Sequence, residues 1–348
     1  MIEKDLKSYT VNIVRDTTSQ IDISETEEWR EYRDVYNRAV NGEEFDYPIH
    51  LEIDNVYACN LHCVHCAREY VEDIGAKRMS DDLYRKVIKE AADIGTKSLG
   101  FAVWGEAFLD KKIFDKIAYA KSCGIIDIRL HSNGLLISDA VAEKIVDSGI
   151  SWLSISLDAA TLETYQKVRG GDFHKAISGL TNIISAKLRK LSLLPRLRVS
   201  FVKCSINEHE ADLFSAHYSQ YCDVAIQEYY DANGILPSQL NVNNQTFSPK
   251  AQCFENFYKA YVKYDGTVVP CCEDIRSKIV LGNVNQSTLY EAYNSPEAKN
   301  LRRQHKSKNI QNKTCRVCMG LDDNSLGNIA AQKVEIPMRS IKTFGDNK

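Results

Sequence analysis

One short stretch, Cys59-Asn60-Leu61-His62-Cys63-Val64-His65-Cys66, constrains this chain more than any other. It follows an apolar alternating run at residues 49–53, which predicts a strand that ends in a cysteine loop. Thiolates are soft ligands that select iron–sulfur clusters, zinc or copper(I). Three thiolates leave one iron of a four-iron cubane open to a non-protein ligand. The spacing therefore indicates a cluster that can bind a small molecule. A zinc site, or three unrelated core cysteines, are the alternatives.

The composition excludes several classes of protein. The 348 residues suffice for one large α/β domain, alone or with a smaller one. A net charge of −3 gives no basic footprint for nucleic acid or an anionic membrane. No apolar run reaches the length of a membrane span, and the first residues lack the apolar centre of a signal peptide. We therefore expect a cytoplasmic protein, in which eleven cysteines indicate metal ligands or chemistry rather than disulfides.

Strand and helix patterns alternate six times after about residue 48. The predicted strands are 51–56, 98–103, 126–130, 152–157, 197–203 and 224–228, and the predicted helices between and after them are 81–94, 111–122, 139–147, 175–189 and 208–221. Such alternation favours an α/β fold with a parallel sheet and right-handed crossovers, either an open barrel or a doubly wound sheet. Upstream, Trp29, Tyr32 and Tyr36 recur at helical spacing, which predicts a helix packed on the outside of the next domain.

Polar residues follow three of these strands, where parallel α/β folds place their chemistry. They are the segments Trp104-Gly105-Glu106-Ala107, His131-Ser132-Asn133-Gly134, and Ser154-Ile155-Ser156-Leu157-Asp158 with Arg169 eleven residues further on. A glycine lets the backbone approach a ligand closely, and a carboxylate can pair with an ammonium group. For the second segment a simple Asn-Gly turn is an alternative of nearly equal weight.

A second set of cysteines begins at Cys253 and continues with Cys271, Cys272, Cys315 and Cys318. Between them, Asp265-Gly266 predicts a hairpin turn and residues 289–304 predict a helix. Four thiolates would close a cluster coordinatively, as in an electron relay or a structural site. A four-cysteine zinc ribbon is the alternative.

The first loop, with the aromatic His65 before its last cysteine, resembles the signature of the radical S-adenosylmethionine (SAM) superfamily. The spacing Cys-x12-Gly-x4-Cys with a late CxxC is similar to a SPASM or twitch domain. The resemblance covers about residues 45–320. It implies a partial (β/α)6 TIM-like barrel over 48–235 and an auxiliary-cluster domain over 236–320, between an extension at 1–47 and a tail at 321–348.

The resemblance also implies ligand sets. Cys59, Cys63 and Cys66 would hold the SAM-binding 4Fe–4S cluster, and one auxiliary 4Fe–4S cluster would be held by Cys253, Cys271, Cys315 and Cys318. His65 would pack on the adenine, Glu106 would contact the amino group of SAM, and Arg169 would contact its carboxylate. The remaining implied SAM contacts are Gly105, Ser132, Asn133 and Ser156, the last near the ribose. Trp104 and Ala107 depart from the family's usual Gly-Gly-Glu-Pro.

The chemistry implied is reductive cleavage of SAM, followed by hydrogen abstraction from a substrate C–H. A flavodoxin- or ferredoxin-type reductant would supply the electron. The single auxiliary cluster favours epimerisation or oxidation of a sugar- or aminocyclitol-type small molecule. A maturase of ribosomal peptides is the first alternative, and a non-catalytic iron–sulfur or zinc protein the second. Cys204 and Cys272 are candidate thiols for returning hydrogen to the substrate. For each of them, a packed and chemically inert thiol is the favoured interpretation.

Overall fold

The computed structural model describes residues 12–13, 26–71, 76–229, 235–242 and 253–322. Its main feature is one ten-stranded sheet in the order β1-β9-β8-β7-β6-β5-β2-β10-β11-β12. The strands are β1 Asn12–Ile13, β2 His50–Ile53, β5 Ser98–Phe101, β6 Asp127–Ser132, β7 Trp152–Ser156, β8 Arg196–Lys203, β9 Asp223–Glu228, β10 Lys259–Val262, β11 Thr267–Val269 and β12 Gly282–Asn283.

The six predicted strands correspond to β2 and β5–β9, and each pairs in parallel with the next along the chain. The predicted α/β class with a mostly parallel sheet is confirmed. The first strand ends earlier than predicted, at Ile53. Val56 belongs instead to a small separate sheet, in which β3 (Val56–Tyr57) pairs antiparallel with β4 (Lys77–Arg78).

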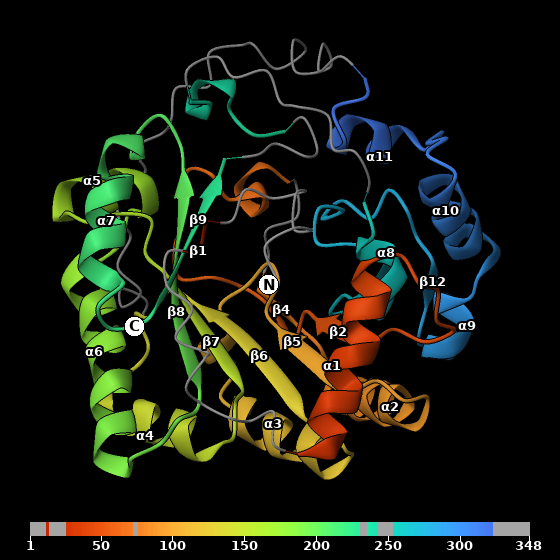
Figure 1. The fold of residues 1–348 in the computed structure, drawn as a ribbon, viewed down its shortest axis with the longest axis horizontal. Helices are drawn as coiled ribbons and strands as arrows, with labels where there is room; N and C mark the ends of the chain where they lie inside the picture. Colours follow the sequence, from red (N-terminus) through yellow and green to blue (C-terminus); the bar gives the residue numbers. More distant parts are fainter. Residues whose placement is uncertain (1–11, 14–25, 72–75, 230–234, 243–252, 323–348) are drawn as a thin grey trace, which may run out of the picture.

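A layer of helices covers one face of the sheet, which we call the outer face (Figure 1). These helices are α2 Asp81–Asp93, α3 Ile113–Ser122, α4 Asp139–Asp147, α5 Leu162–Arg169, α6 Phe173–Lys190 and α7 Ala211–Tyr218. Local signals start several of them: the side chains of Ser80, Ser138 and Asp172 accept N-capping hydrogen bonds. Leu51, Ile53, Leu99, Phe101 and other outward strand residues pack with these helices in the main hydrophobic core.

Short 3₁₀ helices occupy Ala67–Tyr70, Ala107–Leu109, Glu208–Glu210 and Ser238–Leu240. The C-terminal helices are α8 Glu255–Tyr258, α9 Leu289–Tyr293, α10 Pro296–Lys306 and α11 Lys313–Cys318. The prediction of a single helix over 289–304 is therefore wrong, because two helices, α9 and α10, occupy this range. Ser295 caps a new helix with Pro296 in its first turn, because proline lacks an N–H and fits the start of a helix better than its interior.

The region of the second cysteine set is hydrogen-bonded into the barrel sheet. Strand β10 lies parallel to β2, with Lys259 opposite His50 and Val262 opposite Ile53. Because β10–β12 belong to the same sheet as β2 and β5–β9, the predicted domain limits stay predictions. Figure 1 shows α9, α10 and α11 gathered at this end of the sheet, away from β8 and β9.

Helix α1 (Glu27–Val40) lies at the opposite face from the helical layer, near the starts of the strands (Figure 1). Tyr32 and Ala39 are buried in a small cluster with Ile49 and Tyr258. The aromatic stripe predicted from the sequence is thus the buried side of α1, which packs at the base of the barrel and leaves its polar side exposed. In the described part of the chain, no helix has the length and apolarity needed to span a membrane.

Candidate active site

The inner face of the sheet, opposite the helical layer, is polar. Parallel pairing arranges its residues in rungs, since register partners point to the same side. The lowest rung holds Lys259, His50, Ser98 and Asp127. A higher rung holds His131, Ser154 and Arg198. Above it, Ser156 lies opposite Ser200. Alternation places apolar residues outward and these polar residues inward, so any ligand inside the barrel meets hydrogen-bonding groups.

The cysteine loop lies above the end of β2 and is anchored to its surroundings. The Val64 N–H donates to the Val168 carbonyl of α5 at 2.9 Å, and the Tyr70 hydroxyl donates to the Val64 carbonyl at 2.7 Å. The Cys63 thiol is buried, and its pKa is raised by burial. Burial likewise raises the pKa of Cys59 to about 11. Buried thiols of this kind favour a bound metal that stabilises the thiolate form.

Two polar side chains approach these sulfurs. The Asn133 amide lies 3.9 Å from Cys59 Sγ, and Arg169 Nη1 lies 3.7 Å from Cys63 Sγ. Donors to thiolate sulfur are the outer-shell contacts that tune iron–sulfur clusters. The donor set of three thiolates with two hydrogen-bond donors therefore fits the predicted SAM-binding cluster.

Glu106 binds two of the other predicted SAM contacts, Ser132 and Asn133. Its carboxylate accepts from the Ser132 hydroxyl at 2.8 Å and from the Asn133 N–H at 2.8 Å. The Phe108 N–H also donates to it, at 3.2 Å. Burial raises the pKa of Glu106, and these hydrogen bonds oppose that effect. A carboxylate has about four acceptor sites, so one remains for an ammonium group.

Gly105 is needed for a reason the sequence did not reveal. A Cβ at this position would lie 2.0 Å from the Val56 carbonyl oxygen and 3.0 Å from that of Ala58. The glycine therefore allows close approach to the neighbouring backbone of β3. Glu106 N–H donates to the Ala58 carbonyl at 2.8 Å, which fixes this turn beside the cysteine loop.

Asp158 joins His65 to Arg169, a role that sequence reasoning missed. Its Oδ2 lies 3.2 Å from His65 Nε2 and 2.5 Å from Arg169 Nη2. Burial alone would raise the pKa of Asp158, but Arg169 and then His65 outweigh it and lower the pKa to about 2. The adjacent Ser156 hydroxyl accepts from the Ser200 hydroxyl at 3.2 Å. The sequence motif contained Asp158 but gave it no role. Its backbone φ of +55°, an unusual value for a residue other than glycine, is a sign of a functional position that only the structure supplies.

The second set of cysteines converges in the structure. Burial first, and then neighbouring thiols, raise the pKa of Cys271 well above its usual range; these neighbours are Cys272, Cys318, Cys253 and Cys315. All eleven cysteines are described, and none forms a disulfide. Within the described residues, no three His, Cys, Asp or Glu side chains gather as ligands of a single metal ion. Four neighbouring thiols fit the predicted auxiliary cluster, and the individual ligand assignments stay predictions.

Cys272 faces a different environment from Cys271. Burial, and then Glu273 and Glu255, raise the pKa of its thiol well above the usual range, and Tyr261 forms a hydrogen bond with it. Its backbone carbonyl accepts from Trp104 Nε1 at 2.9 Å. Trp104, noted in the sequence only as a departure from the family motif, thus connects the Gly105-Glu106 turn to the second cysteine region.

Cys204, the other candidate thiol, is fully buried at the end of β8. Its N–H donates to Asn207 Oδ1 at 2.7 Å, and Asn207 Nδ2 donates to the Asp158 carbonyl at 2.8 Å. The structure therefore separates the two candidate thiols. Cys272 is partly exposed beside Tyr261, whereas Cys204 is enclosed.

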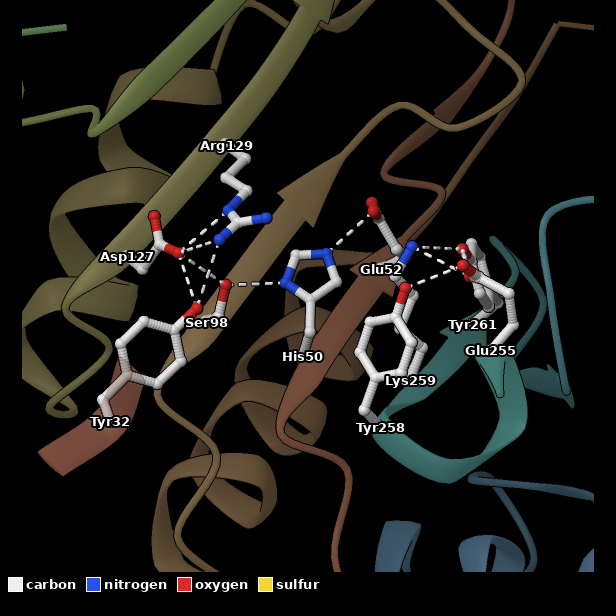
Figure 2. A network of polar contacts seen from close by, with 10 residues as sticks. All are labelled: Tyr32, His50, Glu52, Ser98, Asp127, Arg129, Glu255, Tyr258, Lys259 and Tyr261. Carbon is white, nitrogen blue, oxygen red and sulfur yellow. Dashed lines mark hydrogen bonds and ion pairs between the residues drawn. The ribbon is translucent and has the colours of Figure 1, made fainter. Parts of the chain in front are cut away.

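Figure 2 shows a network of charged and polar side chains at the starts of the strands, which we call the basal network. Asp127 accepts from Tyr32 at 2.7 Å and pairs with Arg129 at 2.6 Å. The remaining members are His50, Glu52, Ser98, Glu255, Tyr258, Lys259 and Tyr261. Lys259 pairs with Glu255 at 2.9 Å. Helices α1 and α8 supply the covering residues of this network, so its charges are enclosed and paired.

A glycine makes room for the central carboxylate of this network. His50 joins Ser98 and Glu52 through its two ring nitrogens, at 2.6 and 2.8 Å. A Cβ on Gly100 would lie 1.9 Å from Glu52 Oε2. Gly100 in β5 therefore makes space for the Glu52 carboxylate on the inner face.

Comparison with known families identifies both cysteine regions. A model of the Radical SAM superfamily matches residues 56–195, and a model of an iron-sulfur cluster-binding domain, SPASM, matches residues 253–319. The first match contains the cysteine loop and the Glu106, Asn133 and Arg169 positions. The second contains the whole C-terminal cysteine set.

Curated relatives match only part of their length. A probable GTP 3',8-cyclase of Methanocaldococcus jannaschii is 32% identical over 158 residues, which is 45% of this chain and 50% of that protein. An AdoMet-dependent heme synthase of Methanosarcina barkeri is 32% identical over 124 residues, 35% of each. The chain thus spans half or less of the length of these two relatives.

Solved structures share the fold at low identity. SuiB of Streptococcus suis bound to its precursor peptide SuiA has a TM-score of 0.62 at 14% identity, covering 90% of this chain and 79% of that one. The structure of anSMEcpe with bound AdoMet has a TM-score of 0.61 at 16% identity, covering 78% of this chain and 85% of that one. BtrN in complex with AdoMet and 2-DOIA has a TM-score of 0.52 at 14% identity, covering 76% of this chain and 89% of that one.

Proposed function

Because the chain belongs to the radical SAM superfamily and carries a C-terminal SPASM iron–sulfur region, we propose that it epimerises or oxidises a sugar- or aminocyclitol-type small molecule. The bound cofactors of such an enzyme, a 4Fe–4S cluster and SAM, supply a 5'-deoxyadenosyl radical that abstracts hydrogen from a substrate C–H. The protein's own residues bind, orient and shield the reactants.

The polar inner face is the observation that supports this substrate class. Residues of β6, β7 and β8 present His131, Ser154, Arg198, Ser156 and Ser200 toward the interior. A polyhydroxylated substrate needs many hydrogen-bonding partners, because each buried hydroxyl without one costs free energy. An apolar substrate would make no use of the remaining hydrogen-bonding capacity of these side chains. BtrN, which shares the fold, was solved with the small molecule 2-DOIA.

Residues beside the cysteine loop would orient SAM. Glu106 has an acceptor site left for the ammonium, and Ser156 would lie near the ribose. Arg169, which now pairs with Asp158, would contact the SAM carboxylate by exchanging one carboxylate partner for another. His65 is held by the same Asp158 and would pack on the adenine.

Cys272 is the better candidate for returning a hydrogen atom to the substrate. It is partly exposed beside Tyr261 on the inner side of the barrel, whereas Cys204 is fully buried. In an epimerisation, the S–H bond breaks and a C–H bond forms on the opposite face of the substrate radical. The resulting thiyl radical then needs one electron and one proton, which the flavodoxin- or ferredoxin-type reductant and solvent would supply. In an oxidation, the substrate radical instead loses its electron and a proton, with the auxiliary cluster as acceptor.

Turnover in deuterated water separates these outcomes. Because thiols exchange with solvent, an epimerase returns one deuterium to the product, while an oxidase returns none. In an epimerase, Cys272→Ala should keep 5'-deoxyadenosine formation but lose the deuterated product, and Cys204→Ala should retain both. If no sugar or aminocyclitol yields a product, and none stimulates 5'-deoxyadenosine formation, the proposed substrate class is contradicted.

Modification of a peptide is the second candidate function. SuiB and anSMEcpe have the higher TM-scores, and their structures include bound peptides. Stimulation of 5'-deoxyadenosine formation by a peptide, with a mass change in that peptide, would favour this function over the first.

A further inference from the structure

Arg198 differs from other cations of the inner face. Arg129 pairs with Asp127 at 2.6 Å, and Lys259 pairs with Glu255 at 2.9 Å. Among the described residues, Arg198 forms no ion pair, although Asp223, its register partner in β9, acts on it electrostatically. Its guanidinium stacks 4.1 Å from the Trp152 ring centroid, and its Nε donates to Ser154 Oγ at 3.2 Å.

These two contacts orient Arg198 without neutralising it. Stacking on Trp152 and the Nε bond leave the two terminal nitrogens, the fork that binds carboxylate and phosphate, for another partner. Burial, and then repulsion by Arg129, lower the pKa of Arg198 to about 10, while Asp223 opposes them. A partly buried cation without an ion pair raises the free energy of the folded state, and an anionic ligand would relieve this.

His131 lies on the same rung, across β7 from Arg198. Ser154 is opposite His131 on one side and opposite Arg198 on the other. His131 is exposed, and a ring N–H donates hydrogen bonds even when the ring is neutral. We call His131, Ser154 and Arg198 the open rung.

The open rung lies directly below the predicted SAM contacts. Ser132 and Asn133 follow His131, and Ser156 and Ser200 lie two residues beyond Ser154 and Arg198. Two residues of strand span about 7 Å. A small molecule anchored on the open rung would therefore place its next few atoms beside the SAM-contacting rung.

We propose that Arg198 and His131 anchor an anionic group, a carboxylate or a phosphate, of the substrate. This rests on the proposed function for the identity of the bound molecule, but the anion site can be tested without it. The substrate class becomes an acidic or phosphorylated sugar- or cyclitol-type molecule, held by its anion and attacked at a carbon nearer SAM. Arg198 is an anchoring residue and takes no part in bond breaking.

The test measures the melting temperature of the cluster-loaded enzyme, saturated with SAM and kept unreduced. Inorganic phosphate and acetate are compared with chloride at equal ionic strength. An anion present at about ten times its Kd stabilises by about 1.4 kcal/mol, or about 2 °C. We expect this shift in the wild type and in Arg303→Gln, whose substitution is at an exposed arginine of α10, and not in Arg198→Gln. Subtracting the Arg198→Gln shift removes the general salt effect of phosphate.

Each outcome has a meaning. A shift with both anions supports an anion site of broad preference, and a shift with one alone identifies phosphate or carboxylate. Equal shifts in wild type and Arg198→Gln overturn the proposal. A shift seen only without SAM also overturns it, because the site would then hold the SAM carboxylate.

Iron content checks that each variant is loaded, and Arg198→Lys, which keeps the charge, should restore part of the shift. SAM cleavage with neutral sugars tests the proposed function separately.

Discussion

The basal network and the open rung occupy the same inner face and differ in how their charges are satisfied. In the basal network, Asp127, Arg129, Glu255 and Lys259 are paired and covered by aromatic residues of α1 and α8 (Figure 2). On the open rung, Arg198 stacks on Trp152 and has no ion-pair partner in the described structure. Polar residues inside a barrel thus serve two purposes: paired, they close its base, and left unpaired, they are available to a ligand.

The largest effect is expected from the loop above both regions. Cys59→Ala removes one of three cluster ligands, so SAM cleavage should fall at least ~1000-fold, with iron dropping from about eight to about four atoms per chain. Formation of 5'-deoxyadenosine by the anaerobically reduced enzyme measures the loss. Cys123→Ala, at the end of α3, should behave like the wild type. Undiminished cleavage in Cys59→Ala would remove the cluster assignment.

Breaking the basal network should cost stability instead. Asp127→Asn leaves the buried Arg129 without its counter-ion, so we expect the free energy of unfolding to fall by about 3–5 kcal/mol. Urea unfolding measures this, and Asp115→Asn, at an exposed position of α3, should change it by less than about 0.5 kcal/mol. A loss below about 1 kcal/mol would show that the network is dispensable for the fold.

A glycine-to-alanine substitution beside the cysteine loop and one in the basal network should separate SAM binding from stability. Gly105→Ala forces a Cβ against the Val56 carbonyl and displaces the turn that carries Glu106, so the Kd for SAM should rise at least ~10-fold. Gly100→Ala displaces only the Glu52 carboxylate and should destabilise by about 1–3 kcal/mol with the Kd for SAM within ~2-fold. Calorimetric titration of SAM decides the matter, and similar losses of affinity in both variants would contradict the separation.

The smallest effect on stability is expected at the open rung. Arg198→Gln removes a cation without an ion pair, so the free energy of unfolding should change by less than about 1 kcal/mol, in contrast to Asp127→Asn. Arg303→Gln provides the surface reference. A loss of about 3 kcal/mol or more would assign Arg198 to the structural network rather than to a ligand.

Much of the barrel was predictable because its signals are local. Alternating apolar runs located β2 and β5–β9, and Ser80 and Ser138 marked the starts of two helices. Capping and side-chain periodicity are set by residues a few positions apart, which a single sequence displays. The end of one helix and the start of the next at Pro296 also have a local signal, the Ser295 cap followed by proline. The prediction missed this signal because the apolar pattern continues on both sides of it.

The cysteine spacings by themselves indicated two sites for an iron–sulfur cluster or zinc, because ligand number and softness restrict what three and four clustered thiols can bind. The resemblance of these spacings to the radical SAM and SPASM signatures then indicated the kind of protein. The tertiary structure alone decided which distant residues meet. It joined β10 to β2, placed α1 under the inner face, paired Asp158 with Arg169, and left Arg198 without an ion pair among the described residues. The physical reason is that burial and ion pairing depend on neighbours brought together by the whole sheet. The spacing of residues along the chain does not show which distant residues become neighbours.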